Sequence, residues 1–130
     1  MSSRVLSGLN VQEPWASLLI DGTKSVETRS YALPKKYEGV ELAIIATPGR
    51  KRNFKAQIIG IVTFSHCFQY KNIKEWLDDS NRHCVSPDSK YYWNVHKQKY
   101  GWVVSNFEKF DKSLDPPAKR GIIFVSNCLI

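Results

Sequence analysis

The sequence predicts an α+β domain that is mainly β: a small antiparallel β-barrel or curled sheet with short flanking helices. About five segments rich in β-branched and aromatic residues recur along the 130 residues. The helical patterns between them are short, and they do not alternate with the strands as a parallel α/β sheet requires. The length is that of one ordinary domain, so we expect a single domain over residues 1–130.

The first elements are expected within residues 4–30. Residues 4–11 (RVLSGLNV) predict a strand in which Gly8 weakens the pattern or marks a bulge. Residues 13–22 (EPWASLLIDG) predict a short helix, because apolar residues recur at i, i+3 and i+4 and Gly22 suits a left-handed stop. Residues 25–30 (SVETRS) then predict a strand.

Two longer strands are expected in the middle of the chain. Residues 40–47 (VELAIIAT) are almost continuously apolar, which predicts a strand buried on both faces. Residues 56–67 (AQIIGIVTFSHC) predict the next strand, with Gly60 at a bulge or bend. The segments 32–39 and 48–55 between the strands are basic loops.

The last third of the chain predicts two helices and two strands. Residues 73–81 and 88–98 predict short helices, and the YYW run at 91–93 would pack one of them on the sheet or offer a stacking surface. Residues 100–110 and 120–127 predict the closing strands.

Composition favours an intracellular protein with an acidic partner. Lys and Arg number 19 against 12 Asp and Glu, which gives a formal charge of +7 and favours nucleic acid, although charge alone speaks only of nonspecific attraction. The three cysteines are too few and too scattered for a disulfide framework. We find neither a signal peptide nor an apolar run that could cross a membrane, so a cytoplasmic location is expected.

Several motifs resemble those of the ASCH domain family, a branch of the PUA-like superfamily. The family's G-x-K-x-x-E-x-R motif after a short helix stands here as Gly22, Lys24, Glu27 and Arg29. The preceding QEPWASLL is similar to the family's Q-P-W-A-S-L, with Glu13 in addition. AQIIGIVTFSHC resembles its middle strand, and KYGWVVSNFEKFDKSLDPPAKRGIIFV resembles its closing segment.

The resemblance implies a PUA-like β-barrel with a nucleotide-sized cleft beside the first helix. It implies binding of nucleic acid, RNA more than DNA. We expect no cofactor. Some relatives are amidohydrolases acting on acylated cytidine, and others have been proposed as ribonucleases. The alternative function is therefore a small hydrolase that uses Lys24, with Glu27 as its acid.

The residues expected to bind the ligand surround the motif. On a strand Glu27 and Arg29 share one face, where they either hold a ligand or form a structural ion pair. Lys24 offers a point charge for a phosphate, or a base if the like charge of Arg29 lowers its pKa. The full set of expected ligand-binding residues is Trp15, Ser17, Lys24, Glu27, Arg29 and Tyr100.

Two basic segments are expected to meet the phosphates. They contribute Lys35, Lys36, Arg50, Lys51, Arg52 and Lys55, and Lys119–Arg120 add to them late in the chain. The alternative is that these are solvated loops. The two His-Cys doublets, at 66–67 and 83–84, lack the spacing of a zinc site, so no metal is expected.

Overall fold

The computed structural model describes residues 4–118 and 121–130 and contains one six-stranded sheet. Its strands are β1 (Val5–Gln12), β2 (Val26–Arg29), β3 (Glu41–Thr47), β4 (Gln57–Tyr70), β5 (Lys99–Leu114) and β6 (Phe124–Leu129). The helices are α1 (Trp15–Ile20), α2 (Ile73–Asp78) and α3 (Ser80–His83), with single 3-10 turns η1 (Lys35–Tyr37) and η2 (Gly49–Lys51). The fold is therefore mainly β with short helices, as predicted.

The sheet is mixed rather than purely antiparallel. Its strand order is β2-β5-β4-β3-β1-β6, and every pair is antiparallel except β1 with β3, which run parallel. The prediction of an antiparallel sheet is wrong for this pair. The segment between β1 and β3, which contains α1 and β2, carries the chain back to the end of the sheet where β1 began, so β3 runs in the same direction as β1. Among the described residues β2 and β6 do not pair, so the predicted closed barrel is not confirmed.

The sheet nevertheless curls strongly. The Arg29 guanidinium of β2 donates a 2.8 Å hydrogen bond to the carbonyl of Asn10 in β1, although three strands separate β2 from β1 in the order of the sheet. On the inner face, the rings of Trp102 in β5 and Phe124 in β6 stack with their centroids 6.1 Å apart. This curl brings β2 close to the end of β1, where α1 begins.

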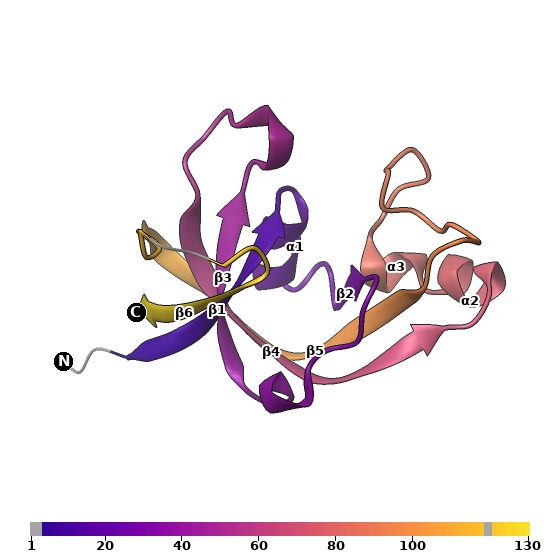
Figure 1. The fold of residues 1–130 in the computed structure, drawn as a ribbon, viewed down its shortest axis with the longest axis horizontal. Helices are drawn as coiled ribbons and strands as arrows, with labels where there is room; N and C mark the ends of the chain where they lie inside the picture. The colour runs from indigo at the N-terminus through magenta and orange to yellow at the C-terminus, as the bar shows by residue number, and fades with distance from the viewer. Residues whose placement is uncertain (1–3, 119–120) are drawn as a thin grey trace.

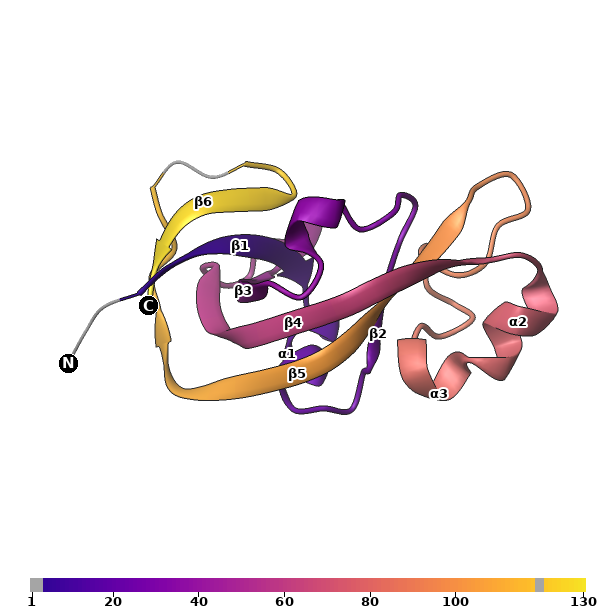
Figure 2. The same ribbon diagram turned by 90° about the horizontal axis from the view of Figure 1, so that it is seen from below.

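Two long strands set the length of the molecule. β4 and β5 run side by side along it, and α2 and α3 pack at one end (Figure 2). The main core lies against α1 and includes the fully buried Phe64 and Trp102. A smaller core at the helical end forms around Trp76, against which Tyr92 and Trp93 pack.

Most glycine predictions are confirmed. The register shifts beside Gly8 and Gly60 are the expected bulges. Gly22 follows α1 with a φ of +86°, which is the left-handed conformation that its position after the helix predicted.

The predicted helix over residues 88–98 is wrong, because this segment forms turns. Short polar side chains bond the nearby backbone instead: Ser89 Oγ accepts from the Tyr91 N–H, and Asn94 Oδ1 accepts from the His96 N–H. Such local bonds offer the backbone an alternative to the helical ladder. The helix expected over 73–81 also divides, into α2 and α3.

Candidate functional site

A cavity of about 710 Å³ lies where β1, α1 and β2 meet the segment 84–98. We call residues 84–98 the aromatic loop and residues 48–55 the basic loop. The motif supplies one wall through Lys24, Glu27 and Arg29, and the aromatic loop supplies the facing wall. A cavity of this size suits a small organic ligand.

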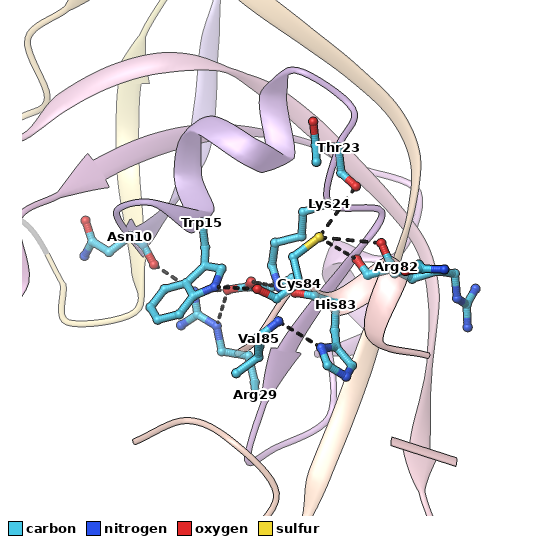
Figure 3. A network of polar contacts seen from close by, with 11 residues as sticks. Asn10, Trp15, Thr23, Lys24, Arg29, Arg82, His83, Cys84 and Val85 are labelled. Carbon is cyan, nitrogen blue, oxygen red and sulfur yellow. Dashed lines mark hydrogen bonds and ion pairs between the residues drawn. The ribbon is translucent and has the colours of Figure 1, made fainter. Parts of the chain in front are cut away.

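Lys24 is buried at the base of the cavity and only 1% exposed. The left-handed turn at Gly22 ends α1, and the Lys24 N–H then bonds the carbonyl of Leu18 at 2.9 Å, which directs the chain inward. The Lys24 ammonium donates to the carbonyl of His83 (Figure 3). It also lies 3.7 Å from the Glu27 carboxylate. Lys24 therefore joins the motif strand to α3.

Glu27 and Arg29 form a buried ion pair on one face of β2, as their spacing predicted. The two side chains meet at 2.8 Å, and Glu27 is only 5% exposed. Arg29 is also fixed by the Tyr31 hydroxyl, at 3.2 Å, and by the Asn10 carbonyl. Glu27 thus lies between two cations, and these bonds hold its carboxylate rigidly in the cavity wall.

Burial lowers the pKa of both buried lysines in the cavity, whereas charged partners raise that of Arg29. Loss of solvation lowers the pKa of Lys24, with a smaller contribution from Arg29, while Glu27 acts in the opposite direction. Burial also lowers the pKa of Lys99, helped by Lys97. For Arg29, burial opposes the charged form, but Glu27 and Tyr31 outweigh it and the pKa is raised.

Aromatic rings form the upper part of the cavity. Trp15 and Tyr91 meet edge to face, with their centroids 5.4 Å apart and their planes at 84°. The Trp15 indole N–H points to the carbonyl of Cys84 at 3.4 Å, and the Tyr91 hydroxyl donates to Gln12 at 3.1 Å. The two rings touch, so a base would stack on an outer face and not between them.

His83 lies behind Lys24 and is held in its neutral form. Its Nδ1 accepts from the Val85 N–H at 3.0 Å, so Nε2 carries the proton that it donates to the Trp76 carbonyl at 2.9 Å. Burial lowers the pKa of His83, and the ring stacks on Trp76 at 3.9 Å. The histidine thereby fixes the carbonyl that receives Lys24.

The cavity contains four of the six expected ligand-binding residues. Trp15, Lys24, Glu27 and Arg29 line it, whereas Ser17 and Tyr100 are absent from the lining. Ser17 is exposed on α1 and donates its hydroxyl to Glu13 at 2.6 Å. Tyr100 pairs with Arg29 across β2 and β5 and packs against the main core.

The two basic segments do not form one surface. Lys35 and Lys36 lie in η1 and the basic loop contains η2, and the two turns occupy opposite ends of the view in Figure 1. Lys51, Arg52 and Lys55 are exposed. The Arg50 side chain and Lys119–Arg120 lie outside the described part of the structure.

Sequence reasoning missed the contribution of the aromatic loop. Lys90 and Lys97 line the cavity, as does Lys99, which is 7% exposed and donates to the Tyr91 carbonyl at 2.8 Å. Lys90 and Lys97 come from the segment that was predicted to be a helix, and Lys99 begins β5. No local spacing linked the three lysines to the motif. The YYW run held a partial signal, because Tyr91 and Tyr92 line the cavity while Tyr92 and Trp93 also pack on Trp76.

The described residues contain neither a candidate metal cluster nor a helix that could span a membrane. No group of three or more His, Cys, Asp or Glu side chains could hold a metal ion within residues 4–118 and 121–130. In the same ranges no helix is long and apolar enough to span a bilayer.

Comparison with known proteins gives a consistent result. The family model of the ASCH domain matches residues 9–112. A search of the curated proteins finds no match. Similar solved structures include an ASCH protein from Zymomonas mobilis and two of its single-residue variants.

These structures share the fold at low sequence identity. One variant has a TM-score of 0.70 and 14% identity, and the match covers 92% of this chain and 86% of that chain. The other variant has a TM-score of 0.65 and 15% identity, with 84% and 74% covered. The unsubstituted protein has a TM-score of 0.67 and 17% identity, with 84% and 72% covered.

Proposed function

This chain belongs to the ASCH domain family, and on that premise we propose that it binds RNA and takes a single nucleotide into the cavity beside the G-x-K-x-x-E-x-R motif. The observation that carries the proposal is the composition of the cavity wall. A fixed carboxylate, four aromatic side chains and several cations meet in one space of about 710 Å³.

Each group has a use in holding a nucleotide. The outer face of Trp15 or Tyr91 can stack on a base, and the Glu27 carboxylate can accept a hydrogen bond from a base edge. The exposed Lys90 and Lys97 can meet the phosphate. Lys24 and Arg29 hold Glu27, so they act on the ligand chiefly by positioning that carboxylate.

Fluorescence anisotropy with a labelled single-stranded RNA tests the proposal. We expect binding that weakens steeply between low and high salt, because protein cations displace counterions from the phosphates. Lys97→Ala should weaken binding several-fold and flatten the salt dependence, whereas Lys112→Ala, an exposed lysine outside the cavity lining, should not. An affinity for RNA that does not change with salt concentration would count against the proposal. Equal losses of affinity in Lys97→Ala and Lys112→Ala would count against it as well.

A second candidate function is hydrolysis of RNA or of a modified nucleoside. The observation that favours it is the buried Lys24, whose pKa is lowered, 3.7 Å from a carboxylate. A neutral amine in that place is a general base or nucleophile. The resemblance implies that the amidohydrolase relatives take their carboxylate from the middle strand, which here is β4 and carries no Asp or Glu. In this chain the acid would instead be Glu27, three residues after Lys24.

The hydrolase is tested by product formation. RNA after incubation is run on a denaturing gel, and N-acylated cytidine is followed by chromatography. Turnover by the wild type that disappears in a folded Lys24→Met variant supports catalysis. Intact RNA and intact nucleoside after long incubation leave binding as the function.

A further inference from the structure

Two loops that carry cations adjoin the cavity. Lys90 and Lys97 belong to the aromatic loop. The basic loop begins directly after Thr47, which also lines the cavity. Both loops rise on the same side of the molecule, with α1 between them, at the top of Figure 1. A chain of phosphates that crosses the cavity mouth would therefore meet positive charge on either side.

Gln12 touches both loops. Its Oε1 accepts from the Tyr91 hydroxyl of the aromatic loop at 3.1 Å. On the other side it packs against Gly49 of the basic loop, where an added Cβ would lie 2.6 Å from the Gln12 amide carbon. The close contact and the φ of +65° at Gly49 fix the start of the basic loop against the end of β1. Gln12 therefore ties the two cationic loops across one end of the cavity.

The cations of the basic loop are placed to bind a nucleic-acid strand rather than a single free nucleotide. Lys51, Arg52 and Lys55 are exposed and do not line the cavity, so a nucleotide within it uses none of them. Phe54 in the same loop is 42% exposed and offers a face on which a neighbouring base can stack. Cations interleaved with an aromatic ring suit a nucleic-acid backbone that continues beyond the bound nucleotide.

We infer that the ligand is a single-stranded RNA segment, with one nucleotide in the cavity and its flanking phosphates along the basic and aromatic loops. This inference rests on the proposed function, since it assumes that RNA binds at the cavity. A nucleotide that enters a cavity must be unstacked and unpaired, which a duplex resists and a single strand does at little cost. The two loops then add phosphate contacts on each side.

Competition binding against a labelled strand of about seven nucleotides, within the ~4–16 that small single-strand-binding folds occupy, tests the inference. The competitors are a mononucleotide, the unlabelled strand and a blunt duplex of the same sequence. We expect the strand to compete at least tenfold better than the mononucleotide and the duplex. Lys51→Ala should weaken binding of the RNA strand several-fold. It should also reduce the slope of log affinity against log salt concentration by about 0.7, the value of one phosphate contact.

The same Lys51→Ala variant should leave the mononucleotide unaffected, and Lys112→Ala should change neither ligand. Equal competition by mononucleotide and strand, or by duplex and strand, would overturn the inference while leaving RNA binding intact. An unchanged affinity of Lys51→Ala for the strand would overturn it as well. If no RNA binds at all, the proposed function fails and the inference fails with it.

Discussion

Three charged side chains define the site at the level of residues. Glu27 lies between Lys24 and Arg29, at 3.7 Å and 2.8 Å, and all three are largely removed from water. Because buried charges are costly unless paired, each change to this trio has an effect on stability that depends on what is left unpaired. The trio is therefore both scaffold and part of the cavity wall.

Glu27→Gln should destabilise the protein more than Lys24→Met. The first change leaves two buried cations without their counter-charge, a situation that costs about 3–5 kcal/mol. The second leaves Glu27 paired with Arg29 and deprives the His83 carbonyl of a donor, which costs about 1–3 kcal/mol. Urea unfolding measures both free energies.

Lys74→Met is the matched control for this pair of variants. Lys74 forms an ion pair with Asp78, but its side chain is 85% exposed, so little change in stability is expected. A Lys24→Met variant that is less stable than Glu27→Gln would contradict the assigned arrangement of charges.

His83 makes stability depend on pH near neutrality. The pKa of His83 in the folded protein is lowered from 6.5. Just below pH 6.5, His83 is therefore protonated in the unfolded chain but not in the folded protein. The contribution is present above 6.5 and is lost as the pH falls towards the lowered value. Burial of the ring is the main cause of the lowered pKa. Protonation of Nδ1 would also break the hydrogen bond from the Val85 N–H.

Urea unfolding of the wild type should therefore show lower stability at about pH 5.5 than at about pH 7.5. His83→Gln should reduce this pH dependence, whatever its effect on absolute stability. His96→Gln, at an exposed histidine, should retain the dependence seen in the wild type. Identical pH dependence in the wild type and His83→Gln would show that His83 does not cause it.

The residue pattern predicted part of this site. Strand periodicity places Glu27 and Arg29 on one face, and their ion pair confirms that expectation. The burial of Lys24 could not be predicted, because it depends on α3, whose carbonyl at His83 is 59 residues away in the chain. Like-charge repulsion from Arg29 was expected to lower the Lys24 pKa, but burial has the larger effect.

At the level of elements, the end of α1 sets the position of the motif. Gly22 adopts a φ of +86°, and a Cβ at this residue would lie 2.5 Å from the Phe107 ring. The turn therefore suits glycine for two reasons, the backbone conformation and the space available. Without this turn Lys24 would not point into the cavity.

Gly22→Ala should destabilise the protein by more than Gly39→Ala. Both residues have positive φ, so both changes carry a strain of about 1 kcal/mol. Nothing lies within 4 Å of an added Cβ at Gly39, so only Gly22→Ala adds a clash, with Phe107. Thermal unfolding compares the two, and equal losses would contradict the close approach of Phe107.

Elements with strong local signals were predictable, and those that depend on distant contacts were not. The apolar run at 40–47 correctly predicted β3, buried along most of its length. The helix expected over 88–98 was wrong because the polar side chains of Ser89 and Asn94 bond the local backbone. Because of that error, the sequence did not indicate that residues 84–98 form one wall of the cavity.

At the level of the whole molecule, the curl of the sheet creates the cavity. It brings β2, at one edge, against β1, as the bond from Arg29 to the Asn10 carbonyl demonstrates. The sequence predicted the mainly β fold class but not the topology of the sheet. No local sequence pattern specifies that β1 and β3 run parallel. The basic segments illustrate the same limit: sequence groups them by charge, and the fold separates η1 from η2 (Figure 1).

The binding of RNA at the cavity is tested most directly by the tryptophan indole N–H signals in an NMR titration. Trp15 lines the cavity, whereas Trp76 and Trp102 are fully buried outside it. A Trp15→Phe variant assigns the Trp15 signal. On addition of single-stranded RNA that signal should shift progressively to saturation, while those of Trp76 and Trp102 stay in place. RNA that binds without moving the Trp15 signal, or that does not bind, would contradict the assignment of this cavity as the nucleotide site.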